Sequence, residues 1–173
     1  MQIDIQDIQR RLSTPDNYGQ ACNFLWLDKT HGIKLFRYKE QRDEALRNQR
    51  KLYKVGLAPK PYKSFDVPAT VEHAFGYITE ICPWLAVELV YFEAIAIHGF
   101  TADQVLDYYS LSIDDYEDFR EICNKFEIDC EKIRDKIHAQ TSLSFCDNHL
   151  WNWGYMYDGS VVCIDTEGMD GEY

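Results

Sequence analysis

Apolar residues recur at every third or fourth position over a long stretch in the second half of the chain. Because a helix turns once in about 3.6 residues, this spacing puts them on one helical face. The pattern is the strongest periodicity in the sequence and predicts a long amphipathic helix from Ile113 to about Gln140. Its apolar positions are Tyr116, Phe119, Ile122, Cys123, Phe126, Cys130, Ile133 and Ile137.

The first part of the chain instead has the short apolar runs and turn residues of a small sheet. Residues 23–28 and 33–37 flank the turn-like segment 29–32, which predicts a β-hairpin. Residues 61–67 and 74–81 predict two further strands. Between these pairs, residues 40–55 carry a one-sided apolar stripe that predicts a helix, which Gly56 and the following prolines should end.

After Pro83 the pattern becomes mainly helical. Residues 84–98 predict a helix buried on most sides, and Thr101 with Gln104 forms a capping box for a short helix over residues 101–109. The segment 142–152 is expected to be irregular. Asp158 and Gly159 are typical of the turn of a final hairpin. We therefore predict an α+β fold with two units, residues 1–83 and 84–173.

Composition limits the classes of function. With 46% hydrophobic residues the chain can bury a core, and its net charge of −11 disfavours nucleic acid and anionic membrane partners. No apolar segment is long enough to span a bilayer, and the start lacks a signal-peptide pattern. The six cysteines are scattered, which fits a reducing, cytoplasmic environment. A zinc site from Cys146, His149 and Cys163 is conceivable, but buried free thiols are favoured.

Three polar residues near the end of the chain have the types that phosphoryl transfer needs. Asp147 and Asn152 lie in the segment after the long helix, and Asp165 ends the last predicted strand. Asp147 can accept or orient the proton of an attacking hydroxyl. Asn152 and Asp165 offer hard oxygen ligands for Mg²⁺, and the hairpin between them can bring the two together.

Two residues of the first unit complete this set. Lys34 lies in the middle of a predicted strand, where its ammonium can reach the phosphates of a nucleotide. Glu44 lies early in the following helix and can hold that ammonium by an ion pair. Glu40 and Asp43 are competing partners, and Glu44 is preferred because the apolar stripe starts beside it. Each residue alone has a structural interpretation: a solvated lysine, a helix-start carboxylate, or turn and cap residues. Their order along the chain favours the functional interpretation.

On these residues the sequence resembles the protein-kinase-like superfamily: Lys34 in a strand, Glu44 in a helix, Asp147 and Asn152 five residues apart, and Asp165 after a strand. The segment around Asp147 is closest to the aminoglycoside-phosphotransferase and atypical-kinase branch. The segment containing Gly19 and Asn23 is similar to the abbreviated nucleotide loop of RIO-type kinases. The resemblance covers residues 13–168.

The resemblance implies a two-lobed fold, with a small antiparallel sheet and one helix above a truncated, mainly helical lobe. It implies ATP and Mg²⁺ as cofactors, with adenine against Ile33 and the backbone near Glu80 and Cys82, and phosphates near Gly19. The expected activity is transfer of the γ-phosphoryl group to a protein serine or threonine.

Two alternatives remain open. The first is a kinase for a small alcohol, as in the aminoglycoside or choline type. The second is a pseudokinase scaffold that binds a protein partner without catalysis. The poor glycine loop, which keeps Gly19 alone, and the short segment after Asp165 favour the scaffold.

Overall fold

The computed structural model describes residues 5–11, 17–18, 22–67, 74–80, 113–145, 152–156 and 158–171. The described residues form an α+β fold with a five-stranded antiparallel sheet in the order β1-β2-β3-β5-β4. Its strands are β1 (Asn17–Tyr18), β2 (Cys22–Trp26), β3 (His31–Phe36), β4 (Pro61–Asp66) and β5 (Phe75–Glu80). The predicted hairpin and the two further strands are confirmed, with ends shifted by one or two residues.

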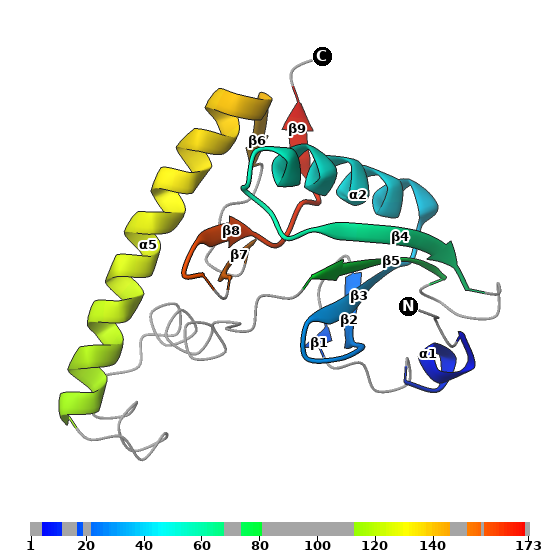
Figure 1. The fold of residues 1–173 in the computed structure, drawn as a ribbon, viewed down its shortest axis with the longest axis horizontal. Helices are drawn as coiled ribbons and strands as arrows, with labels where there is room; N and C mark the ends of the chain where they lie inside the picture. The colour runs from blue at the N-terminus through cyan, green and yellow to red at the C-terminus, as the bar shows by residue number, and fades with distance from the viewer. Residues whose placement is uncertain are drawn as a thin grey trace.

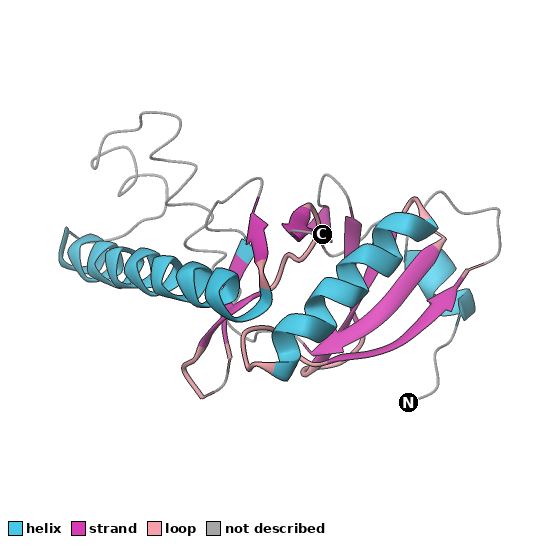
Figure 2. Ribbon diagram, turned by 90° about the horizontal axis from the view of Figure 1, so that it is seen from above, coloured by secondary structure: helices cyan, strands magenta, loops and turns pink. Residues whose placement is uncertain are grey.

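Helix α2 (Lys39–Lys54) lies along one face of this sheet, and the short helix α1 (Ile5–Arg11) lies on the other side (Figures 1 and 2). The predicted helix over residues 40–55 is confirmed. Val55 ends it, and Gly56 follows with a φ of 75° and donates its N–H to the carbonyl of Tyr53. A glycine adopts this left-handed conformation without steric cost, which explains why the helix ends here.

The second half of the described chain is built on the long helix α5 (Ile113–Thr141), which runs diagonally beside the sheet in Figure 1. Two small sheets pack near its end: β7 (Trp153–Tyr155) pairs with β8 (Val161–Cys163), and β6 (Leu143–Phe145) pairs with β9 (Met169–Gly171). The long helix and the β7–β8 hairpin are confirmed. The expectation that residues 142–152 are irregular is wrong for β6, because its partner β9 lies far along the chain.

The core has two parts on either side of the sheet and a third beneath the end of α2. Ile33 and Leu35 pack with Ile8 of α1 on one sheet face. Phe36 and Tyr77 stack on the other face, against Ala45 and Leu46 of α2. Residues from both halves of the chain share the third cluster, which contains Leu52, Leu57, Ala58, Cys130, Ile137, Leu143, Trp153, Val161, Cys163 and Met169.

Buried polar side chains attach α2 to the sheet. Arg42 is 4% exposed and donates to the carbonyls of Phe65 and Gly76 at 3.1 and 3.3 Å. Gln49 donates to the Thr79 hydroxyl at 2.6 Å and accepts a bond from the Tyr77 hydroxyl at 2.7 Å. Buried polar groups cost free energy unless they are paired, so these bonds fix how α2 sits on the strands.

The turn between β2 and β3 contains a carboxylate, Asp28, whose contribution to stability is lost at acid pH. Asp28 accepts bonds from the backbone N–H of Thr30 at 2.7 Å and of His31 at 2.9 Å. The Thr30 N–H, followed by the Thr30 hydroxyl, lowers the pKa of Asp28 to about 2 from an ordinary value of 3.8. A carboxyl whose folded pKa is depressed stabilises the fold above its unfolded pKa and loses that contribution as the pH falls.

We therefore expect wild-type protein to lose stability between about pH 4 and about pH 2 partly through protonation of Asp28. The Asp28→Asn variant keeps an acceptor oxygen but does not titrate, so its unfolding free energy should fall less steeply over this range. Urea denaturation at a series of pH values measures the two slopes. Glu40→Gln, an exposed change, is the control, and equal slopes for wild type and Asp28→Asn would contradict the prediction.

Candidate functional site

Strand β3 carries Lys34 in the centre of the sheet. The strand lies between β2 and β5, where Lys34 is opposite Phe24 on one side and Tyr77 on the other. Side chains alternate along a strand, so Lys34 shares a sheet face with Phe36, on the side that α2 covers. Lys34 is only 8% exposed, which is unusual for a lysine and requires a polar partner for its ammonium.

The ammonium of Lys34 finds that partner far along the chain. Its Nζ donates a hydrogen bond of 2.5 Å to the carbonyl oxygen of Ile164, 130 residues later. Ile164 directly precedes Asp165. The bond therefore holds the only charged group of β3 next to the backbone of one of the two predicted metal ligands.

The β7–β8 hairpin brings Asn152 back to Asp165. Trp153 is opposite Cys163 at the open end of this hairpin. The next residues outward, Asn152 and Ile164, therefore also face each other. The carbonyl oxygen of Asn152 accepts the N–H of Ile164 at 2.7 Å and that of Asp165 at 3.3 Å. Asn152 is 5% exposed and Asp165 is half-buried. Lys34, Asn152 and Asp165, which are remote in sequence, are thus gathered in one place.

The predicted ion pair between Lys34 and Glu44 is absent, although the structure describes both residues. Glu44 is half-buried on α2, while the Lys34 ammonium is directed to the Ile164 carbonyl. Glu44 directly precedes Ala45, whose carbonyl oxygen accepts the Thr166 hydroxyl at 2.8 Å. Helix α2 therefore does reach the segment around Asp165, but through its backbone rather than through the carboxylate of Glu44.

Two residues that the sequence did not single out connect α2 to this segment. Asn48 is 2% exposed and donates to the carbonyls of Thr166 at 3.1 Å and of Met169 at 3.5 Å. Thr166 is fully buried and bonds back to Ala45. The sequence did carry a signal for Asn48, because it lies three residues after Ala45 on the apolar stripe of the helix.

The two described residues that were predicted to contact adenine, Ile33 and Glu80, lie in different parts of the sheet. Ile33 is fully buried and packs on the sheet face opposite Lys34, so a ligand that touches the Lys34 ammonium would not touch Ile33. The N–H of Glu80 already donates to the Lys60 carbonyl at 2.9 Å. The carbonyl oxygen of Glu80 accepts the Thr79 hydroxyl at 3.0 Å.

The side chain of Glu80 shapes the electrostatics of this sheet edge. Its carboxylate accepts the Tyr62 hydroxyl at 3.2 Å. Burial, and then the negative charge of Glu80, raise the pKa of Tyr62.

The other three predicted site residues, Gly19, Cys82 and Asp147, lie outside the described residues, as do Cys146 and His149 of the conceivable zinc set. The Cys163 thiol donates to the Asp165 carbonyl at 2.9 Å.

Among the residues that the structure describes, no group of three or more His, Cys, Asp and Glu side chains is placed to hold a metal ion. The same residues include no helix that is long and apolar enough to cross a membrane. Comparison of the sequence with models of known protein families and with curated proteins gave no match.

Proposed function

We propose that this chain is an ATP-dependent phosphotransferase with a protein-kinase-like fold, which moves the γ-phosphoryl group of Mg-ATP to a hydroxyl. The observation that carries the proposal is the 2.5 Å bond from Lys34 Nζ to the carbonyl of Ile164. It joins the central strand of the sheet to the backbone that also holds Asn152 beside Asp165. A buried amine that bonds to the backbone between an asparagine and an aspartate supports binding of a magnesium nucleotide, which needs an amine, an amide and a carboxylate.

The donor set fits Mg²⁺. This ion prefers oxygen ligands and is usually held by one or two carboxylates together with substrate phosphates, so a large cluster of acidic side chains is not required. Asp165 would supply the carboxylate and Asn152 the amide oxygen. When bound, the ion would neutralise the charge that develops on the phosphates.

The remaining steps use the chain's own groups. Lys34 would exchange the Ile164 carbonyl for phosphate oxygens, which are stronger acceptors because they are charged. Asp147 would orient the acceptor hydroxyl and take its proton. We favour a protein serine or threonine as the acceptor, with a small alcohol as the alternative.

A scaffold that binds a protein partner without catalysis is the second candidate. Two observations favour it: Lys34 already has a backbone partner, and it forms no ion pair with Glu44 although both are described residues. In that case Lys34 acts as a structural tie between the sheet and the last hairpin, and no nucleotide binds.

Thermal and urea denaturation with and without Mg-ATP separates the two candidates. A ligand at a hundred times its Kd raises the unfolding free energy by about 2.7 kcal/mol, and we expect this for wild-type protein. Asp165→Asn should lose the magnesium-dependent part. Asp158→Asn, at the exposed tip of the same hairpin, should retain it. The absence of any shift in wild type would exclude nucleotide binding and leave the scaffold.

A transfer assay then tests the reaction. Labelled ATP is incubated with a casein-like protein and, separately, with a panel of small alcohols, which distinguishes the two acceptor classes. Asp147→Asn should abolish transfer while keeping the Mg-ATP shift. Transfer that persists in this variant would contradict the role given to Asp147.

A further inference from the structure

A long basic segment stands out in this acidic chain. Residues 45–65 contain no aspartate or glutamate, although the whole protein has 29 acidic residues against 18 basic ones. The segment covers the second half of α2 and most of β4, and every one of its lysines and arginines is exposed. These residues are Arg47, Arg50, Lys51, Lys54, Lys60 and Lys63.

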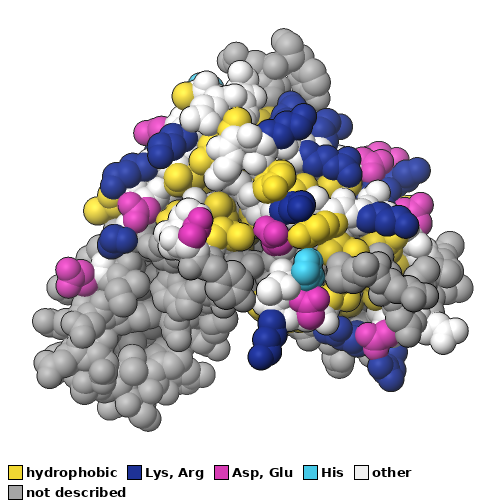
Figure 3. Space-filling model, in the orientation of Figure 1, with side chains coloured by type: hydrophobic (Ala, Val, Ile, Leu, Met, Phe, Trp, Pro, Cys, Tyr) yellow, Lys and Arg dark blue, Asp and Glu magenta, His cyan; other side chains and the backbone are white. Residues whose placement is uncertain are grey.

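Four of them form a single stripe on α2, which we name the α2 basic stripe: Arg47, Arg50, Lys51 and Lys54. Steps of three and four residues place side chains on one helical face, so the stripe runs along the outer side of α2 for about 10 Å. The opposite face is buried in the protein. Dark blue side chains gather over α2 in the space-filling view (Figure 3).

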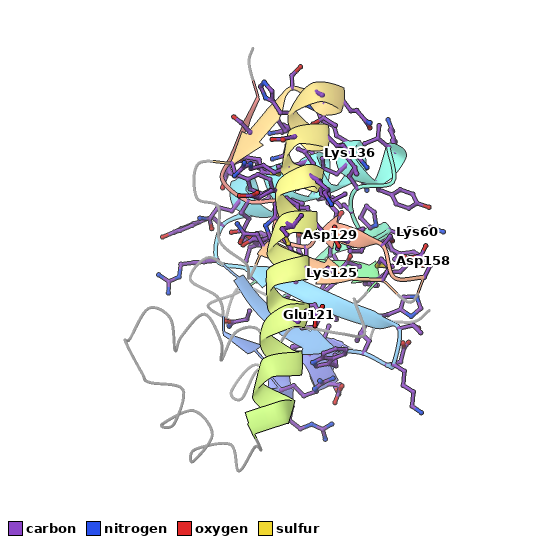
Figure 4. The ribbon with its side chains drawn as sticks, turned by 90° about the vertical axis from the view of Figure 1, so that its left-hand side faces the viewer. Lys60, Glu121, Lys125, Asp129, Lys136 and Asp158 are labelled. Carbon is purple, nitrogen blue, oxygen red and sulfur yellow. The ribbon has the colours of Figure 1, made fainter. Side chains whose placement is uncertain are left out.

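The positive charges of the stripe are not neutralised by ion pairs within the described part of the chain. None of its four side chains forms an ion pair there. On α5, by contrast, Lys125 pairs with Asp129 at 3.5 Å (Figure 4), and Lys132 pairs with the same carboxylate at 3.3 Å. Like charges four residues apart destabilise a helix, as for Arg47 with Lys51. Lys51 and Lys54 lie in the last turn of α2, where the helix dipole favours positive charge, but Arg47 and Arg50 lie before that turn and gain no such stabilisation.

We propose that the α2 basic stripe docks an acidic segment, rich in aspartate and glutamate, of another protein. Charge complementarity gives the sign of the partner. The net charge of the protein limits the length of the partner. Because the chain as a whole carries −11, a polyanion longer than the stripe would be repelled by the protein surface outside it. A nucleic acid or an anionic membrane extends well beyond about 10 Å, while a short acidic peptide segment does not. This surface does not depend on the proposed catalytic activity.

Fluorescence anisotropy with a labelled oligoglutamate peptide tests the proposal, with oligoglutamine as the uncharged control peptide. We expect binding to oligoglutamate alone, weakening as salt rises. The Arg47→Glu/Lys51→Glu variant should bind at least about tenfold more weakly. Lys132→Glu/Lys136→Glu, which makes the same change in net charge on exposed positions of α5, should bind as wild type does.

Several results would overturn the proposal. One is no binding of oligoglutamate at low salt, and another is an equal loss in the two double variants, which would reflect net charge alone. Tighter binding to a short DNA duplex or to phosphatidylserine vesicles would assign the stripe to a different class of partner. Self-association in sedimentation that Arg47→Glu/Lys51→Glu abolishes would assign it to a second copy of the chain.

Discussion

Replacing Lys34 by methionine is expected to abolish the stabilisation by Mg-ATP and to reduce phosphoryl transfer by about 100-fold to 1,000-fold. Methionine has a similar length but no charge, so it cannot neutralise phosphate oxygens. It also removes the donor of the Ile164 carbonyl, which should lower the unfolding free energy by about 1–3 kcal/mol without ligand. Calorimetry of Mg-ATP binding and the transfer assay measure the functional losses, and urea denaturation measures the structural one.

Lys39→Met is the matched control, because Lys39 is exposed at the start of α2. It should leave both stability and the response to Mg-ATP unchanged. Loss of stability in Lys34→Met together with an undiminished Mg-ATP response would show that Lys34 is only a structural tie. The proposed role in nucleotide binding would then be wrong.

Replacing Trp153 by alanine should have the largest effect on stability, about 3–5 kcal/mol. Trp153 is 2% exposed and packs in the cluster that joins the end of α2 to α5 and the two small sheets. Its ring centroid is 5.1 Å from that of Phe145. Because Trp153 directly follows Asn152, the cavity should also release the predicted metal ligand from its position beside Asp165.

Urea denaturation gives the loss of stability, and the Mg-ATP shift of the folded variant gives the loss at the site. Trp153→Phe fills much of the cavity and should recover part of both. Tyr53→Ala removes an aromatic ring that is 42% exposed and should change stability by less than about 0.5 kcal/mol. A Trp153→Ala variant that is as stable as Tyr53→Ala would contradict the assignment of Trp153 to the core.

The elements that local patterns define were predictable. The hairpin of β2 and β3, helix α2, strands β4 and β5 and the long helix α5 all follow from apolar periodicity and from turn residues close in sequence. Gly56 and the Asp158–Gly159 turn work in the same way, because the conformation of a turn depends on the few residues that form it.

Contacts between distant segments were not predictable in the same way. The three-residue strand β6 is too short for a periodic pattern, and it exists because Leu143 lies opposite Gly171. The ion pair expected between Lys34 and Glu44 rested on proximity in sequence. The structure instead directs the Lys34 ammonium to the Ile164 carbonyl, and the contact between α2 and this segment is made by Asn48 and Thr166.

The sequence alone determined the order and type of most described elements and the set of residues with suitable chemistry, because both depend on side-chain type and near neighbours. Only the tertiary structure decided which of those residues meet. Lys34, Asn152 and Asp165 come together because the β7–β8 hairpin brings Asn152 to Ile164 and Asp165, and because the Lys34 ammonium bonds to the Ile164 carbonyl. Ile33, next to Lys34, is excluded from that place because adjacent residues of a strand face opposite sides.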